Sequence, residues 1–328
     1  MDLLNHLLIG FENAVTWTNL LYCFVGVTLG TLVGVLPGMG PVATVAMLLP
    51  ITYALDPSTA LIMLAGIYYG AQYGGSTTAI LVNIPGEASA VVTCLDGHRL
   101  ALAGRAGAAL GIAAIGSFIA GCFATVVIAA FAEPLTQVAF QFGPREYFSL
   151  MVLGLVGAVV LASGSLLKAV GMILIGILLG CVGMDVNSGA LRYVFGIDEL
   201  MDGFDFVALS MGVYGFAEII RNLDVLGDRE AKPVPVGRVL PSKNDLKISA
   251  GPIARGTLIG SFLGILPGGG ALLSSFASYT LEKKLAGEKA NPPFGHGNIR
   301  GVAGPESANN AGAQASFIPM LTLGIPSN

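Results

Sequence analysis

Charged side chains are scarce in this sequence. Asp, Glu, Lys and Arg make up 11% of the 328 residues while hydrophobic residues make up 54%, whereas soluble domains are typically about 25% charged. A large soluble core could hold many apolar residues, but it would still need a charged shell. Long stretches of this chain contain no charged residue. The composition therefore excludes an ordinary soluble fold and indicates a protein surrounded largely by lipid.

A basic tail and closely spaced cysteines are also lacking. The formal net charge is −4, and the Lys and Arg residues lie in a few segments between apolar runs, so we expect no nucleic-acid partner. The four cysteines, Cys23, Cys94, Cys122 and Cys181, are scattered and mostly lie inside apolar runs. Because metal sites and disulfide frameworks need closer pairs, we interpret them as lipid-facing or packed small hydrophobic residues.

Long apolar runs predict an all-α fold, a polytopic membrane helical bundle. A bilayer core about 30 Å thick requires about 20 apolar residues per helix. Candidate spans lie at 16–36, 106–131, 146–163, 166–183, 206–221 and 251–267. The segment 42–84 is also apolar, but Pro50, Pro57 and the glycines at 70, 74 and 75 divide it into pieces too short to span a membrane individually. We expect broken or re-entrant helices there.

The distribution of charge predicts an orientation and a division of the chain. Segment 221–247 is rich in Lys and Arg and is therefore expected in the cytoplasm, and the acidic segment 184–205 on the opposite side. We expect 1–222 to form a first transmembrane repeat, 223–250 a basic cytoplasmic loop, and 251–328 the start of a second, incomplete repeat.

One proline and glycine motif occurs twice. GTLVGVLPGMGP occupies 30–41 and GSFLGILPGGGA occupies 260–271, so the matched residues are 230 positions apart. Weaker echoes follow in the same order: Ala71-Gln72 with Ala313-Gln314, and Asn83-Ile84-Pro85 with Gly324-Ile325-Pro326. On the charge pattern the two motifs run in opposite directions through the membrane. Such inverted repeats with discontinuous helices are typical of secondary transporters.

The motifs have the chemistry of a break in a helix. Proline cannot donate a backbone hydrogen bond, and glycine allows backbone angles closed to other residues. Free backbone groups at membrane depth persist only when they are buried in protein or line a wet cavity. We therefore expect these residues to bind substrate: Pro37, Gly38, Met39, Gly40, Pro267, Gly268, Gly269 and Gly270. Alternatively, the glycines form close helix contacts and the prolines mark surface loops.

Hydroxyl and amide residues follow each motif. In the first repeat, Ser76 is expected to cap a half-helix whose free amides face an anion. The predicted substrate-binding residues are Gly74, Gly75, Ser76, Thr77 and Thr78 after the first motif, and Asn309 and Asn310 after the second. The expected sodium ligands are Thr44, Asn83, Ser274 and Thr322. The alternative is that each Ser and Thr only satisfies a nearby helix carbonyl.

Ionisable residues are almost absent from the candidate spans, although a proton relay would require them there. Glu87 and Glu306 lie at the edges of motifs, and Glu218 lies beside Arg221. We expect a solvated or paired structural role for each of the three glutamates. Anion recognition is then expected to depend on helix dipoles, backbone amides and hydroxyls.

These motifs resemble a known family. GTLVGVLPGMGP, GIYYGAQYGGSTTAILVNIPGE, DGHRLALAGRAGAALG and GILPGGGA are similar to segments of the TctA family, the large membrane subunits of tripartite tricarboxylate transporters. The resemblance implies a bacterial inner-membrane permease that receives a di- or tricarboxylate such as citrate from a periplasmic solute-binding protein. It also implies a small membrane subunit as partner and a cation gradient, often of sodium, as driving force. Because members of that family are considerably longer, we expect this chain to be C-terminally truncated.

The leading functional hypothesis is cation-coupled uptake of a carboxylate, with Na⁺ as coupling ion and no other cofactor. Another carrier for organic anions and a channel are the alternatives. An intramembrane enzyme is a third class, but it needs a nucleophile, base or metal ligand within the bilayer. His98 and His296 flank loops, and no Ser-His, paired-carboxylate or metal-ligand spacing occurs at membrane depth. We therefore expect a transporter and not an enzyme.

Overall fold

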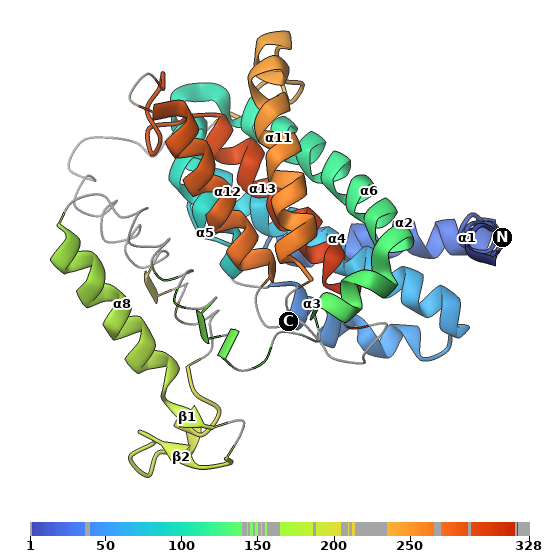
Figure 1. Ribbon diagram of the computed structural model, residues 1–328, viewed down its shortest axis with the longest axis horizontal. Coiled ribbons are helices and arrows are strands. Elements are labelled where there is room, and N and C mark those ends of the chain that lie inside the picture. Colours follow the sequence, from blue (N-terminus) through green and yellow to red (C-terminus); the bar gives the residue numbers. More distant parts are fainter. Residues whose placement is uncertain are drawn as a thin grey trace.

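The computed structural model (Figure 1) describes most of the chain. The described residues are 2–36, 40–139, 165–185, 188–204, 235–265, 270–287, 290–318 and 320, with single positions between 143 and 155 and between 209 and 213. Within them the chain is predominantly helical, as predicted, and the β1–β2 hairpin is the sheet that the described part contains.

The elements follow one another in two series. The first series is α1 (Asp2–Ala14), α2 (Trp17–Gly34), α3 (Pro41–Leu48), η1 (Leu49–Thr52), α4 (Pro57–Val82), η2 (Ala88–Ala90), α5 (Val91–Thr93), η3 (Cys94–His98), η4 (Ala101–Arg105) and α6 (Ala106–Ala139). The second is α8 (Leu166–Gly180), β1 (Gly183–Met184), β2 (Leu191–Arg192), η5 (Asp198–Leu200), α11 (Lys243–Leu263), α12 (Gly270–Ala286) and α13 (Arg300–Ala315).

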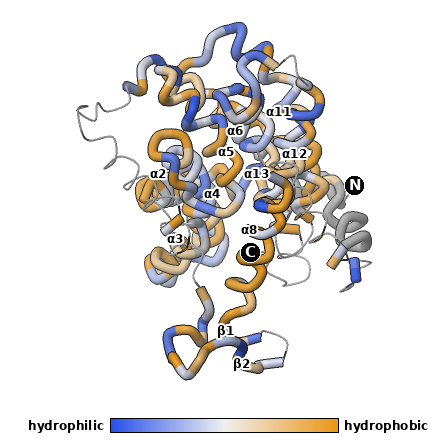
Figure 2. Tube along the Cα trace, turned by 90° about the vertical axis from the view of Figure 1, so that its left-hand side faces the viewer, coloured by the Kyte–Doolittle hydropathy of each residue, from blue (hydrophilic) through white to orange (hydrophobic). Residues whose placement is uncertain are grey.

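Two of the described helical stretches are long and apolar enough to cross a membrane, Trp17–Gly34 and Ala101–Ala130. They correspond to the predicted spans at 16–36 and 106–131. Ala43–Thr52 and Leu166–Gly180 form shorter apolar helices. Figure 2 shows α8 as an apolar rod that leads to the β1–β2 hairpin. The predicted spans 146–163 and 206–221 lie largely outside the described residues.

Two predicted boundaries are wrong. The helix expected at 166–183 ends at Gly180 and gives way to β1 at Gly183. The helix expected at 251–267 begins at Lys243, so the end of the predicted loop 223–250 is helical. The physical reason is a capping box, in which Ser242 and Asp245 satisfy each other's backbone amides at the start of α11.

The prediction of a broken segment at 42–84 is only partly correct. α3 ends at Leu48, and Pro57 begins a new helix at a position that proline favours. From there, however, α4 continues without interruption through Gly70, Gly74 and Gly75 to Val82. A buried glycine inside a helix costs about 1 kcal/mol relative to alanine, and contacts with neighbouring backbone can offset that cost.

Glycines on α2 make such contacts with α4. An added Cβ at Gly26 would lie 2.4 Å from the carbonyl oxygen of Met63, and one at Gly30 would lie 2.2 Å from that of Ile67. At Gly34 it would lie 2.4 Å from the carbonyl oxygen of Ala71. The two backbones therefore approach so closely that only glycine fits along this face of α2.

The same packing recurs between α11 and α13. Added Cβ atoms at Gly256, Gly260 and Gly264 would lie 2.3, 2.3 and 2.4 Å from the carbonyl oxygens of Gly304, Ala308 and Gly312. The glycines are 230 positions after those of α2, as the motif predicts. Their partners are 241 positions after Met63, Ile67 and Ala71. Thus Ala71 corresponds to Gly312, and the predicted match of Ala71-Gln72 with Ala313-Gln314 is off by one residue.

The two series are joined through Asp96, a fully buried residue of η3. Its Oδ1 accepts hydrogen bonds from the backbone amides of Gly295, Gly297 and Asn298 at 2.9, 2.8 and 2.7 Å. Its Oδ2 accepts one from the Tyr279 hydroxyl at 2.7 Å. Three of these bonds fix the segment that precedes α13, and the fourth holds α12. α13 itself packs against α6, α11 and α12.

Candidate functional site

A buried carboxylate lies where α13 meets the first repeat. The side chain of Glu306 is almost fully buried. Its Oε2 accepts a hydrogen bond from Ser76 Oγ at 2.6 Å, and its Oε1 accepts one from Thr93 Oγ1 at 2.5 Å. No Lys, Arg or His in the described part of the chain forms an ion pair with it. Of the solvated or paired role expected for Glu306, the solvated alternative is therefore wrong, because the carboxylate is buried and its partners are hydroxyls.

A second carboxylate, Glu87, lies nearby through a turn back onto α4. Asn83 ends α4 in the left-handed conformation, with φ of 61°. An added Cβ at Gly86 would lie 2.2 Å from the Cα of Gly75, so the two backbones touch. This contact brings the partly buried Glu87 to α13, where its Oε1 accepts a hydrogen bond from Asn309 Nδ2 at 2.8 Å.

The facing sides of α4 and α13 carry polar atoms without partners. Ser76 meets Glu306 at one end, and at the other the ring of Tyr69 stacks on that of Phe317, with centroids 6.5 Å apart. Gln72 lies between Tyr69 and Ser76 on the same face of α4. It therefore faces the part of α13 that follows Glu306.

On these two helices, three buried side-chain atoms have no hydrogen-bond partner in the described structure. They are Gln72 Oε1, Asn309 Oδ1 and the Tyr69 hydroxyl. Buried polar atoms are nearly always satisfied, so a group of unsatisfied ones calls for an explanation such as a bound ligand or ion. We refer to the following residues as the inter-repeat site: Tyr69, Gln72, Ser76, Glu87, Thr93, Glu306, Asn309 and Phe317.

The structure places Ser76 in this site but not in its predicted role. Ser76 lies in the middle of α4 and not at the start of a half-helix, so it does not cap an anion site. Thr77 and Thr78 donate to the carbonyls of Tyr73 and Gly75 in their own helix, which is the alternative stated above. Gly74 packs against Gly34 and Gly75 against Gly86.

The ends of the two breaks are alike. Thr44 Oγ1 donates to the Gly40 carbonyl at 2.9 Å, and Ser274 Oγ donates to the Gly270 carbonyl at 2.5 Å. Both hydroxyls are buried and occupy the same place in the two repeats. An added Cβ at Gly40 would lie 3.4 Å from the Gly86 carbonyl oxygen, so the first break ends beside the turn that carries Glu87.

The remaining predicted residues have different outcomes. Asn309 belongs to the inter-repeat site, whereas Asn310 donates to Ser117 Oγ at 2.7 Å and so joins α13 to α6. Asn83 ends α4, and its role as a sodium ligand stays a prediction. The predicted residues that lie outside the described part are Pro37, Gly38, Met39, Pro267, Gly268, Gly269 and Thr322. Glu218 also lies outside it.

Reasoning from the sequence overlooked Glu306, Thr93 and Gln72 as members of a site. The signal for Glu306 was available, because an ionisable residue among apolar membrane segments is by default a functional candidate. Thr93 gave no such signal. It lies in a three-residue helical turn, α5, and nothing in the local sequence indicates that it meets a helix more than two hundred residues later.

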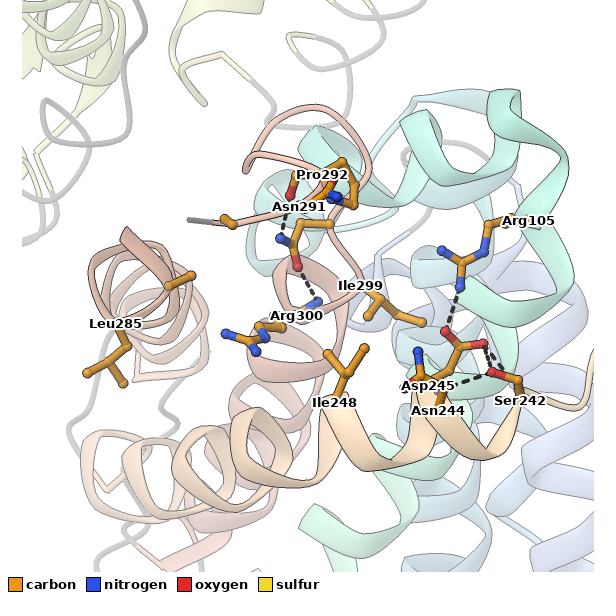
Figure 3. A pocket seen from close by; sticks show the side chains of 13 residues that line it. Arg105, Ser242, Asn244, Asp245, Ile248, Leu285, Asn291, Pro292, Ile299 and Arg300 are labelled. Atoms are coloured by element: carbon orange, nitrogen blue, oxygen red, sulfur yellow. Dashed lines mark hydrogen bonds and ion pairs between the residues drawn. The ribbon is translucent and has the colours of Figure 1, made fainter. Parts of the chain in front are cut away.

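A separate cavity of about 600 Å³ lies at the start of α11 and α13. Figure 3 shows Arg105 and Arg300 among its lining side chains, with Arg105 Nη2 2.5 Å from Asp245 Oδ1. Burial by itself raises the pKa of Asp245, but hydrogen bonds from Ser242 and the charge of Arg105 outweigh it and hold the pKa below its usual value. α13 thus runs from this cavity to the inter-repeat site.

Comparisons with known proteins identify the family of this chain. Residues 20–328 match the tripartite tricarboxylate transporter TctA family. The chain is 59% identical, over all its residues and 65% of the relative, to an "Uncharacterized 52.8 kDa protein in TAR-I ttuC' 3'region" of Agrobacterium vitis.

A second relative from Agrobacterium vitis is an "Uncharacterized protein in TAR-II ttuC' 3'region", 68% identical over 21% of this chain and 28% of the relative. No solved structure matches. The chain spans about 65% of the length of the first relative. The match over almost the whole sequence shows that the chain belongs to the TctA family of tripartite tricarboxylate transporters, a family of membrane transporters.

Proposed function

We propose that this chain is part of a multi-pass permease of the bacterial inner membrane that takes up di- or tricarboxylates such as citrate. Uptake is driven by a cation gradient, with Na⁺ as the coupling ion. A periplasmic solute-binding protein delivers the substrate, and a small membrane subunit works beside the permease. Membership of the TctA family supports this general role.

One structural observation carries the proposal further. The packing of α2 on α4 recurs between α11 and α13, and unsatisfied buried polar atoms lie where the two repeats meet. A carrier works by moving one repeat relative to the other around a site between them. A duplicated scaffold with polar groups between its halves is the arrangement that this mechanism requires.

The test is uptake of radiolabelled citrate into proteoliposomes that contain the full-length protein and its partners, with and without a Na⁺ gradient. We expect saturable accumulation that collapses with the gradient. Flux that rises in proportion to substrate and needs no gradient would identify a channel.

The two breaks can be tested in the same assay with Gly38→Val and Gly268→Val. A branched side chain restricts the backbone angles available at these positions, so we expect each variant to insert into the membrane but to lose uptake. Gly171→Val on α8, where an added Cβ would meet nothing within 4 Å, is the control. Retained uptake in both motif variants would remove the breaks from the site.

A further inference from the structure

We propose that Glu306 is the carboxylate that binds the coupling cation, together with oxygen atoms of Ser76, Thr93, Gln72 and Asn309. This inference rests on the proposed function, because it names the residue through which a cation gradient would drive uptake. The ligand is a monovalent cation that carboxylate and hydroxyl oxygens can hold. It is Na⁺ on the proposed function, and the experiment below distinguishes Na⁺ from a proton.

The surroundings of Glu306 contain no compensating positive charge among the described residues. The ionisable groups that interact with it electrostatically are Tyr73 on α4, Cys94 at the start of η3, and Glu87. None of these groups is positively charged. A buried carboxylate without a positive partner is unfavourable by several kcal/mol or more, so a bound cation would stabilise this arrangement.

The guanidinium of Arg255 on α11 is already paired with another carboxylate. On α12, which packs against α13, Glu282 forms a bidentate ion pair with Arg255 of α11. Arg255 Nε lies 2.6 Å from Glu282 Oε1, and Arg255 Nη2 lies 2.8 Å from Glu282 Oε2. Arg255 is therefore held by Glu282, which packs against α13 at Gly304, two residues before Glu306. Among the described residues of α11 and α12, no other basic side chain forms an ion pair in this region.

Two unsatisfied oxygens lie beside the Ser76–Glu306 pair. Gln72 and Asn309 are 2% and 1% exposed, and Gln72 Oε1 and Asn309 Oδ1 accept no hydrogen bond in the described structure. Each lies one helical turn from the Ser76–Glu306 pair and faces the space between α4 and α13. Side-chain and backbone oxygens of this kind are the groups that hold hard cations in proteins and coupling ions in carriers.

The Ser76 hydroxyl has two hydrogen-bond acceptors within reach. Its hydroxyl lies 2.6 Å from Glu306 Oε2 and 3.2 Å from the Gln72 carbonyl oxygen. When Glu306 is charged, the hydroxyl hydrogen can point to Oε2. When a cation is bound, the hydroxyl hydrogen can rotate to the Gln72 carbonyl, and Ser76 Oγ is then free to accept a hydrogen bond from protonated Glu306 or to coordinate Na⁺. The pair can accommodate both states without movement of the backbone.

The ligands come from different halves of the molecule. Ser76, Gln72 and Thr93 belong to the first repeat, whereas Glu306 and Asn309 belong to the second. A relative movement of the two repeats would separate the hydroxyls from the carboxylate and lower the affinity for the cation. Binding of the cation is thereby linked to the conformation of the carrier.

The decisive variant is Glu306→Gln in the full-length protein with its partners, reconstituted in proteoliposomes. The amide has nearly the same shape but cannot carry the charge. We expect it to exchange labelled for unlabelled substrate across the membrane, as the wild type does, but to lose accumulation driven by a gradient. Imposing a pH gradient and a Na⁺ gradient separately on the wild type identifies which of the two ions is bound.

Ser76→Ala provides a second test that does not alter the charge. If Na⁺ is the ion, we expect the Na⁺ concentration that gives half-maximal uptake to rise about tenfold, which corresponds to about 1.4 kcal/mol of binding free energy. If a proton is the ion, the pH profile of uptake should shift instead. Ser307→Ala is the matched control, because the buried Ser307 hydroxyl donates only to the Ala303 carbonyl of its own helix.

The outcomes separate the inference from the proposed function. A wild type that takes up no di- or tricarboxylate under any gradient contradicts the proposed function. A wild type that accumulates substrate, beside a Glu306→Gln variant that accumulates it equally well, contradicts the inference alone. If Glu306→Gln does not assemble, Ser76→Ala decides, and cation dependence identical to that of Ser307→Ala would overturn the assignment.

Discussion

α4 and α13 occupy equivalent places in the two repeats, yet they carry different chemistry. Both pack on a glycine face, α4 against α2 and α13 against α11. By the 241-residue relation that the contacts define, Glu306 corresponds to Ala65, and Ser76 corresponds to Phe317. The scaffold is therefore duplicated while the functional groups are not: the first repeat supplies the hydroxyls of Ser76 and Thr93, and the second supplies the carboxylate of Glu306 that accepts from them.

The largest expected effect comes from cutting the connection between the halves at Asp96. Asp96→Ala leaves three backbone amides of the segment 295–298 without an acceptor. Each unsatisfied buried amide costs about 1–3 kcal/mol, so for three amides we expect a loss of about 3–9 kcal/mol. The measurement is thermal unfolding in detergent.

The matched control for that variant is Asp198→Ala in η5, a helical turn with no buried residue. Its unfolding temperature should equal that of the wild type. If Asp96→Ala unfolds at the same temperature as Asp198→Ala, the four bonds do not hold the two halves together.

A smaller effect is expected at the glycine faces, and it tests their equivalence. In Gly30→Ala and Gly260→Ala the new Cβ would lie 2.2 and 2.3 Å from a carbonyl oxygen of the partner helix. Forced contacts of this kind cost about 1–3 kcal/mol. We expect similar losses in both variants, measured as the shift in unfolding temperature.

Gly121→Ala on α6 is the control for this pair, since nothing lies within 4 Å of its added Cβ. The intrinsic preference of helices for alanine should make it neutral or slightly stabilising. A large loss at Gly30 with none at Gly260 would show that the two packings are not energetically equivalent.

The smallest expected effect is at the ion pair of Arg105 and Asp245. The pKa of Asp245 is lowered in the folded protein, so the charged carboxylate stabilises the fold above its unfolded pKa of about 3.9. That contribution is lost as the pH falls through the lower, folded pKa. Because the Arg105 side chain is 42% exposed, we expect less than about 1 kcal/mol.

The measurement compares the unfolding temperature of the wild type and Asp245→Asn between neutral pH and acidic pH. The difference between the two proteins should be constant near neutrality and shrink below about pH 4. A difference that persists unchanged in acid would mean that Asp245 acts through its capping hydrogen bonds and not through its charge.

Much of the scaffold could be predicted because glycine leaves a periodic trace. The spacing of Gly26, Gly30 and Gly34 places them on one face of a helix, and the same spacing at Gly256, Gly260 and Gly264 indicates the same packing. The partner helix was matched less well. The shared Ala-Gln pair suggested a register one residue away from that of the contacts. A match of only two residues carries little information about position.

The treatment of glycine as a helix breaker explains the main error in the candidate site. Gly70, Gly74 and Gly75 suggested a break before Ser76, but each is buried against neighbouring backbone inside a continuous α4. Local propensity is a weak influence of about 1 kcal/mol per residue, and tertiary packing overrides it. As a result, Ser76 faces another helix and does not begin one.

The sequence by itself determined the lipid-compatible composition, the helical class and the duplicated glycine motif, because these depend on residue type and on spacing within single segments. Only the tertiary structure decided that Glu306 receives hydrogen bonds from Ser76 and Thr93. The reason is physical, since helical periodicity shows which side chains share a face but not which distant helix that face will meet. The partners of a buried carboxylate depend on that meeting.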